Sequence, residues 1–238
     1  MHITKLGGLT ARLTGGTDGK GGGDGPLVVL LHGFGAPGDD LVPLHQVIQG
    51  PPGTRYVFPE ASLALGMGFG ESRAWWMIDM DQLQRDIASG RVRDLSQTVP
   101  QGLAEARAAV TALLHDVERT MDVKPTRLVL GGFSQGAMLA CDVVLRTARP
   151  FAGLILLSGT LLAQDEWGPL MPARQGLPVL QSHGRSDPLL SAVMAERLRD
   201  RLTAAGLPVH WVPFNGGHEI PMTVVRELGP FVTRITAS

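Results

Sequence analysis

The stretch RLVLGGFSQGAMLACDVVL, residues 127–145, decides the fold class. Residues 127–131 form an apolar run typical of a buried strand, and residues 137–145 are typical of a buried helix. Between them, residues 132–136 read Gly-Phe-Ser-Gln-Gly. A strand that enters a helix through Gly-x-Ser-x-Gly is a nucleophile elbow, in which a sharp turn lifts the serine hydroxyl clear of the sheet. This setting predicts that Ser134 is a nucleophile.

The glycines that flank Ser134 have a physical reason in such an elbow. The turn is strained, and the positions beside it must be small because the strand and the helix nearly touch there. The alternative is an ordinary strand-to-helix turn with a solvated serine, since a chain with 31 glycines can produce the pattern by chance. The strand before the motif and the helix after it favour the elbow.

Length and composition restrict the class of protein. With 238 residues, 44% of them hydrophobic and 18% charged, the chain is long enough for one substantial core, and we expect a single domain over residues 1–238. The net charge of −1 and the absence of a polybasic block argue against nucleic acid as a partner. Cys141 is the only cysteine, so no intrachain disulfide can form, and its place in the predicted buried helix indicates an apolar filler.

The termini and apolar runs predict a cytoplasmic protein. Residues 1–6 lack the long apolar stretch of a secretory signal, and no run approaches the length that crosses a bilayer. Residues 15–25, GGTDGKGGGDG, are expected to be a flexible hairpin loop after an N-terminal strand or strand pair. The oligomeric state cannot be read from this pattern.

Strands and helices alternate along the chain. Besides the elbow strand, strands are predicted at residues 27–31, 55–58, 153–157, 177–182 and 209–214, and helices at 39–48 (capped by Asp39 or Asp40), 95–121 (capped by Ser96), 192–205 and 222–235. This alternation predicts an α/β fold with a doubly wound, mostly parallel sheet. The gap between the strands that end at 157 and begin at 177 is too short for an inserted cap domain, so residues 60–95 are the expected lid-like cover of the site.

A serine nucleophile needs an imidazole base, and the base needs a carboxylate. His218 lies in a glycine-rich loop between the last predicted strand and the last helix. Asp187 follows an earlier strand, at the edge of the sheet where Ser134 also emerges, and its rival is Asp165 after the preceding strand. The chain order Ser134, Asp187, His218 is that of α/β-hydrolases, so we predict this triad.

Attack of a serine on a carbonyl creates an oxyanion, which two preorganised N–H groups must stabilise. The backbone amide of Gln135, at the start of the predicted helix, is one candidate, because the helix dipole also favours an anion there. The backbone amide of Phe34, in the glycine-rich loop after the strand at 27–31, is the other. His32 in the same loop has no partners at metal-ligand spacing, so we expect a hydrogen-bonded structural histidine and no metal site.

Four linked motifs resemble those of a known family. They are HGFGAPGDDL at 32–41, GGFSQGAMLA at 131–140, HGRSDPLL at 183–190 and GGHEIP at 216–221. In this order they are similar to the phospholipase/carboxylesterase family of α/β-hydrolases, which includes acyl-protein thioesterases and bacterial carboxylesterases. The resemblance implies an α/β-hydrolase fold without a separate cap domain and the same triad and anion-hole residues. The chain departs from typical members over residues 66–95, so the substrate preference does not carry over.

The substrate is expected to be a small ester. Trp75, Trp76 and Met67 lie in the segment most apt to overhang Ser134 and are the candidate pocket residues; the alternative for the tryptophans is packing against the sheet. The leading hypothesis is a serine carboxylesterase for short- to medium-chain esters that forms an acyl-enzyme and needs no cofactor. The alternatives are a thioesterase or lysophospholipase for longer acyl chains and, more remotely, a hydrolase-like binding protein without activity.

Overall fold

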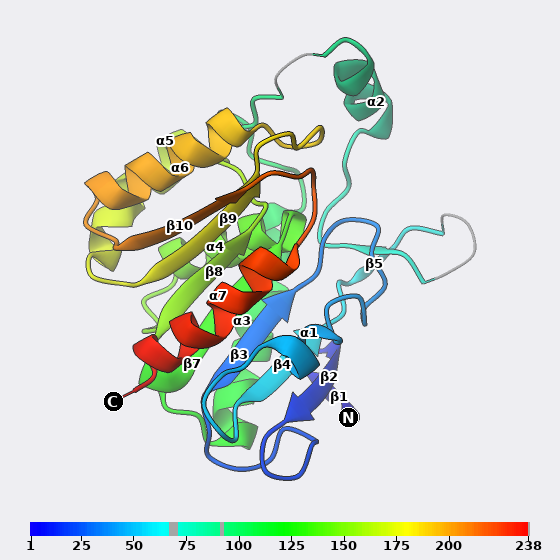
Figure 1. The fold of residues 1–238 in the computed structure, drawn as a ribbon. Coiled ribbons are helices and arrows are strands. Elements are labelled where there is room, and N and C mark those ends of the chain that lie inside the picture. Colours follow the sequence, from blue (N-terminus) through cyan, green and yellow to red (C-terminus); the bar gives the residue numbers. More distant parts are fainter. Residues whose placement is uncertain (67–70, 91–92, 238) are drawn as a thin grey trace.

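The computed structural model describes residues 1–66, 71–90 and 93–237. Its centre is an eight-stranded sheet (Figure 1). In spatial order the strands are β1 (His2–Leu6), β2 (Leu9–Gly15), β4 (Arg55–Pro59), β3 (Leu27–Leu31), β7 (Leu128–Phe133), β8 (Gly153–Leu157), β9 (Val179–Gly184) and β10 (Val209–Phe214). All strands from β4 to β10 are parallel, whereas β2 pairs antiparallel with both β1 and β4. The mostly parallel sheet predicted from the alternation of elements is therefore confirmed.

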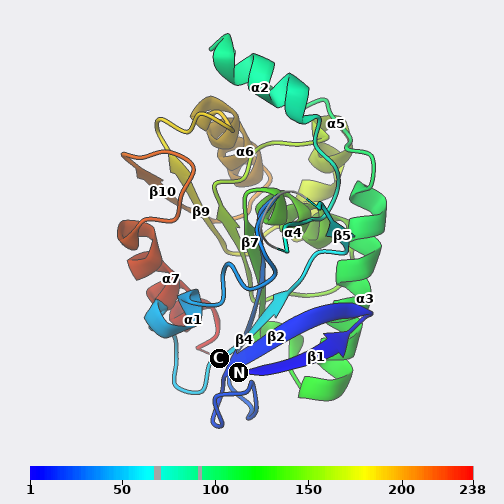
Figure 2. The same ribbon diagram turned by 90° about the vertical axis from the view of Figure 1, so that its right-hand side faces the viewer.

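Helices cover both faces of this sheet (Figure 2). One face carries α3 (Leu103–Met121), α4 (Gln135–Arg146) and α6 (Ala192–Ala204), and the other carries α1 (Leu44–Val47) and α7 (Met222–Ile235). The remaining short helices are α5 (Gln164–Trp167) and the 3-10 turns η1 (Pro125–Arg127) and η2 (Gly168–Arg174). The strand β3 reflects this division, because Val29 and Leu31 pack on the α3–α4 side while Val28 and Leu30 pack on the α7 side. A strand buried on both faces reads as a continuous apolar run.

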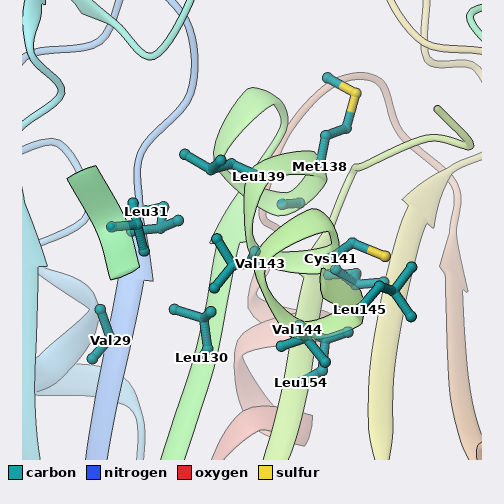
Figure 3. Close-up of a cluster of buried hydrophobic side chains, with 14 of the residues drawn as sticks. Val29, Leu31, Leu130, Met138, Leu139, Cys141, Val143, Val144, Leu145 and Leu154 are labelled. Carbon is teal, nitrogen blue, oxygen red and sulfur yellow. The ribbon is translucent and has the colours of Figure 1, made fainter. Parts of the chain in front are cut away.

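The helix α4 is the most buried helix and anchors the elbow. Every residue from Gln135 to Leu145 is buried, and Val143 and Val144 pack against Leu130 and Leu154 of the strands below (Figure 3). Cys141 belongs to the same cluster, and burial raises the pKa of its thiol. The start of α4 is therefore held rigidly against the sheet.

The order in which strands are added to the sheet reverses at β3, and this reversal marks a place where ligands can bind. From β3 it passes to β4 on one side and then crosses to β7 on the other, so the switch point lies between β3 and β7. Leu31 at the end of β3 is in register with Gly132 of β7. In open α/β sheets, ligands bind outside the carboxyl ends of the strands at such a switch point.

A long excursion of the chain lies beyond that edge. The strands β5 (Leu63–Ala64) and β6 (Arg73–Ala74) form a small hairpin, and α2 (Met80–Ala88) stands past the carboxyl ends of the parallel strands in both views (Figures 1 and 2). Asp79 caps α2 by accepting a hydrogen bond from Gln82 N at 2.8 Å. Leu83 is the only side chain of α2 that is buried.

Three expectations about local structure were wrong. The helix expected over 39–48 is reduced to the four residues of α1, which begins after Pro43 rather than at a capping aspartate. The helix expected from residue 95 begins at Leu103, because Pro100 and the left-handed Gly102 (φ 92°) precede it. The loop at 15–25 joins β2 to β3, which are separated by β4 in the sheet, so it is not a hairpin loop.

Within the described ranges, none of the helices combines the length and the apolar character needed to cross a bilayer.

Candidate functional site

Ser134 occupies a strained turn between β7 and α4. Its φ of 55° and ψ of −117° lie where a residue with a side chain is rarely found. Its N–H donates to Leu157 O at 2.8 Å, which ties the turn to β8. A Cβ on Gly136 would collide with the carbonyl of Leu31, and one on Gly132 would lie 2.5 Å from the carbonyl carbon of Gly136. The two glycines are therefore required by the close approach of β3, β7 and α4.

Three polar side chains converge at this turn. The Nε2 of His218 lies 2.8 Å from Ser134 Oγ, and its Nδ1 lies 2.6 Å from Asp187 Oδ2. Asp187 follows β9 and His218 follows β10, so the two loops meet beside the elbow at the carboxyl edge of the sheet. The rival acid, Asp165, is exposed on α5 and takes no part in this chain of hydrogen bonds.

Backbone hydrogen bonds fix the orientation of the Asp187 carboxylate. Its Oδ1 accepts hydrogen bonds from the N–H groups of Leu189 (2.8 Å) and Leu190 (2.9 Å), which leaves Oδ2 for the imidazole. Burial alone would raise the pKa of Asp187, but the hydrogen bond and charge of His218, with the two amides, outweigh burial and lower that pKa. The ring of Phe133 packs at 4.8 Å from the His218 ring and completes its positioning.

A second histidine lies behind the carboxylate. His183 of β9 is buried, with its Nε2 at 2.8 Å from Leu190 O and 3.4 Å from Asp187 Oδ2. Burial lowers the pKa of His183, more than the nearby carbonyl and carboxylate raise it, and so favours a neutral ring. His183 thus fills the space behind Asp187 without adding a competing positive charge.

Phe34 and Gln135 both line the cavity at Ser134. The N–H groups of Phe34 and Gln135 donate to no other backbone group among residues 1–66, 71–90 and 93–237. Gly33 packs against Ser134, since a Cβ built on it would be 3.4 Å from the serine Cβ. The loop that carries Phe34 is held by two backbone bonds to Arg73: Gly35 N to Arg73 O (2.8 Å) and Arg73 N to Ala36 O (3.0 Å). Two donors are therefore available for an oxyanion at this point.

Charged side chains brace the same loop from outside. Arg73 pairs with Glu60 at 2.6 Å, and Arg12 pairs with the other carboxylate oxygen of Glu60 at 3.1 Å. Glu60 is buried, so both guanidinium groups compensate its charge. Arg73 is thus a structural residue of the Phe34 loop rather than a solvated loop charge.

His32 has a structural role. Its Nδ1 lies 2.8 Å from Gly33 O, and its Nε2 lies 3.0 Å from Ala61 N, so Nδ1 donates and Nε2 accepts. Burial lowers the pKa of His32, which agrees with this neutral tautomer. Trp75 donates its indole N–H to His32 O at 2.9 Å, and its ring lies tilted against the His32 ring with the centroids 5.5 Å apart.

The side chain of Gln135 fastens the tryptophan segment to the elbow. Its Oε1 accepts from Trp75 N and its Nε2 donates to Trp76 O, both at 2.9 Å. The side chain is completely buried, so these two hydrogen bonds take the place of the hydrogen bonds that it would form with water. One residue therefore presents an amide to the site with its backbone and fixes the adjacent wall with its side chain.

A cavity of about 550 Å³ opens above Ser134. Trp76, Met138 and Leu162 line it on the side of the sheet, and α2 contributes Leu83 and Ile87 from the opposite side. Trp75, which was expected at the cavity, does not line it because its ring is packed on His32. Met67, the third expected pocket residue, lies outside the described residues.

Comparisons with known proteins agree with this architecture. The sequence model of the family described as Phospholipase/Carboxylesterase matches residues 20–235. The chain belongs to this family. It is 26% identical over 178 residues to acyl-protein thioesterase 1 of Cryptococcus neoformans, an alignment that covers 74% of this chain and 71% of that protein. It is therefore a hydrolase of the carboxylesterase and acyl-protein thioesterase type.

Solved structures place this member of the phospholipase/carboxylesterase family in the α/β-hydrolase fold. Esterase PE8 superimposes with a TM-score of 0.79 at 26% identity, over 95% of this chain and 99% of the esterase. A carboxylesterase of Bacillus cereus superimposes with a TM-score of 0.68 at 18% identity, over 95% and 94% of the two chains. The fold expected from the motifs is confirmed.

Two parts of the site were missed by sequence reasoning. The helix α2 had a usable signal, since Asp79 is a good N-cap and Leu83 and Ile87 recur at helical spacing. The side-chain contacts of Gln135 had no local signal, because its partners Trp75 and Trp76 are about sixty positions away in the chain.

Proposed function

We propose that this protein is a serine carboxylesterase that hydrolyses short- to medium-chain esters through an acyl-enzyme. The observation that carries the proposal is the continuous chain of hydrogen bonds from Ser134 Oγ through His218 to Asp187, at the floor of an apolar cavity. The two free amides beside Ser134 supply the remaining requirement of acyl transfer.

In the first half-reaction, Ser134 Oγ attacks the ester carbonyl while its proton passes to His218 Nε2. The carbonyl oxygen gains the electron pair and accepts hydrogen bonds from the amides of Phe34 and Gln135. When the C–O bond to the alcohol breaks, His218 returns its proton to the leaving oxygen. Asp187 stabilises the imidazolium throughout and holds the tautomer in which Nδ1 carries the proton.

In the second half-reaction, a water molecule takes the place of the alcohol. His218 removes its proton as the water oxygen attacks the acyl carbon, and the same two amides stabilise the second oxyanion. Collapse breaks the bond to Ser134, whose oxygen regains the proton from His218. The carboxylic acid leaves, and the enzyme is restored without a cofactor.

The size and lining of the cavity support a small substrate. Its volume of about 550 Å³ lies within the range of about 300–1,000 Å³ that is usual for small-molecule sites. Trp76 and Met138, which line it, are both buried, and such side chains form a closed apolar wall. An acyl or aryl group of modest length fits such a space.

Replacement of the nucleophile tests the proposal. Ser134→Ala should remove nearly all hydrolysis of p-nitrophenyl butyrate and all labelling by a fluorophosphonate probe, with an unchanged circular dichroism spectrum. Ser186→Ala is the matched control, because Ser186 is exposed on the Asp187 loop and should leave both readouts intact. Unaltered turnover by Ser134→Ala would refute the assignment, and absence of labelling in the parent protein would favour a binding protein without activity.

A thioesterase that acts on longer acyl chains is the second candidate, favoured by the acyl-protein thioesterases among the relatives. Pairs of esters and thioesters with the same acyl group, compared over a series of chain lengths, separate the two. The carboxylesterase proposal predicts that kcat/KM peaks at short to medium chains for the oxygen esters. A continued rise of kcat/KM with chain length for thioesters would favour the second candidate.

A further inference from the structure

A second hollow adjoins the cavity above Ser134. Its volume is about 320 Å³, and it lies between the end of α2, the Asp187 loop and the start of α6. Ile87, Arg93 and Leu189 line both spaces, so the two adjoin along these side chains. A group that extends from a substrate at Ser134 into this hollow would pass Arg93.

Arg93 is the charged residue at the junction. Its side chain is partly buried, and it forms no ion pair or hydrogen bond with the residues that the structure describes. The negative charge of nearby Asp86 partly offsets the cost of burying Arg93, but Asp86 Oδ1 already accepts a hydrogen bond from Gln82 Nε2 at 2.7 Å. Partial burial lowers the pKa of Arg93 by more than the nearby charge of Asp86 raises it.

Arg185 adds a second cation to the hollow. It lies on the Asp187 loop, is exposed, and has no carboxylate partner within residues 1–66, 71–90 and 93–237. Among the other partly buried arginines, Arg146 pairs with Asp142 and Arg73 pairs with Glu60, whereas Arg174 donates to a backbone carbonyl. Within the described residues, neither Arg93 nor Arg185 has a direct carboxylate contact or a carbonyl acceptor, and both line the same hollow.

Acidic and basic side chains both line these spaces. Asp40 and Asp79 line the cavity above Ser134, and the second hollow holds Asp86 and Asp187 beside its two arginines. Asp86 accepts a hydrogen bond from Gln82, and Asp187 is engaged by His218 and by two backbone amides. Asp79 caps the beginning of α2, whereas Arg93 follows its end, and a nine-residue helix is about 13 Å long. Arg93 and Arg185 thus lie near the end of α2 that is remote from Asp79.

We propose that the substrate of this enzyme carries an anionic group, a carboxylate or phosphate remote from the scissile ester, and that Arg93 with Arg185 binds it in the second hollow. The planar guanidinium suits both anions because it offers parallel N–H donors to two oxygens. This inference rests on the proposed esterase function and adds the class of substrate to it.

Esters that differ only in a terminal carboxylate test the inference. One arm compares mono-p-nitrophenyl adipate and suberate with the neutral hexanoate and octanoate esters. The other arm compares butyryl esters of ω-hydroxy acids with those of the matching alkanols, followed by titration of released acid. The anionic member should have the higher kcat/KM in one arm, by about tenfold, as one charge-assisted hydrogen-bonded pair in a partly exposed site provides. The preference should shrink as salt is added.

Variants separate anion binding from structural effects. Arg93→Gln should abolish the preference for the anionic esters, and Arg93→Lys should restore part of it. Arg185→Gln should reduce the preference less, because Arg185 is exposed. Arg85→Gln is the matched control, since Arg85 lies on α2, lines neither space and bonds to Gln82. It should change nothing.

The outcomes are distinct. Equal kcat/KM for anionic and neutral esters in both arms overturns the inference while the esterase function stands. The inference also fails if Arg93→Gln lowers turnover of both kinds of ester equally, because the residue is then structural. If Ser134→Ala retains turnover of the neutral esters, the proposed function itself fails.

Discussion

The replacement Asp187→Asn examines how the carboxylate controls the imidazole of His218. Asp187 Oδ1 accepts the N–H groups of both Leu189 and Leu190, at 2.8 and 2.9 Å. An asparagine must keep its oxygen at that position, because an NH2 group cannot face two donors. Its NH2 group then points at His218 Nδ1, which becomes an acceptor.

The consequence for catalysis follows from the tautomer. With Nδ1 unprotonated, the ring proton lies on Nε2, which faces Ser134 Oγ at 2.8 Å and can no longer accept the serine proton. The imidazolium of the transition state also loses its counter-ion. An equivalent exchange in serine proteases lowers kcat by about ten thousandfold, so we expect a loss of about a thousandfold to ten-thousandfold here.

The assay is kcat for p-nitrophenyl butyrate at constant pH, together with thermal unfolding. Asp187→Asn should keep a thermal midpoint close to that of the parent, because the hydrogen-bond partners of Oδ1 are retained. Asp165→Asn is the control and should keep full activity, since Asp165 is exposed on α5. A folded Asp187→Asn protein with kcat within tenfold of the parent would show that the carboxylate does not set the tautomer, and a loss in Asp165→Asn instead would reassign the acid.

Three further results are expected. Asp142→Ala removes a completely buried carboxylate that pairs with Arg107 and Arg146 and accepts the indole N–H of Trp167, and it should lower the free energy of unfolding in urea by about 2–4 kcal/mol. Asp200→Ala, at an exposed pair, should leave the urea midpoint unchanged. Gln135→Leu leaves the N–H of Trp75 and the C=O of Trp76 without their hydrogen-bond partner and should lower the free energy of unfolding by about 2–4 kcal/mol in the same measurement. An unchanged midpoint would show that the Gln135 side chain does not hold this segment. In the folded protein the pKa of His32 lies below 6.5. As the pH falls below 6.5, the imidazole therefore takes up a proton in the unfolded chain before it does so in the folded protein. Stability that is present above pH 6.5 is then lost as the pH falls toward the folded-state pKa, by up to about 1.4 kcal/mol per pH unit. Urea titrations from pH 8 to 5 measure this slope, which His32→Gln should reduce.

Much of the fold could be predicted because the strands are buried on both faces. The runs at 27–31 and 153–157 are apolar without interruption, and the structure has strands at these same positions. Ser134, Asp187 and His218 each follow a parallel strand of the same sheet, namely β7, β9 and β10. Parallel strands bring their carboxyl ends to one edge, so sequence order alone brings Ser134, Asp187 and His218 near one another.

The wall of the cavity could not be predicted in the same way. Trp75 and Trp76 lie in a bend directly after β6, where no regular alternation tells which ring faces the cavity. Contacts distant in the chain decide which one: His32 takes the indole of Trp75, and Gln135 fixes the backbone of both. Local pattern carries no information about such partners.

Helix boundaries failed for a related reason. Ser96 resembles a helix N-cap in the sequence, yet it is buried in a turn, and its backbone carbonyl accepts a hydrogen bond from Gln164 N. That tertiary bond competes with helix formation, and α3 begins only after Gly102. Helix propensity predicts a boundary poorly where contacts with a distant segment fix the backbone.

The sparse anchoring of α2 has an evolutionary consequence. A helix that buries only Leu83 contributes little to the stability of the sheet, so substitutions on its surface are nearly free of the folding constraints that hold Ser134, His218 and α4. Its cavity-facing positions can therefore drift while the reacting groups stay in place. Selection for a new ester can act on this one helix, and libraries confined to residues 77–90 are the economical way to retune the enzyme in the laboratory.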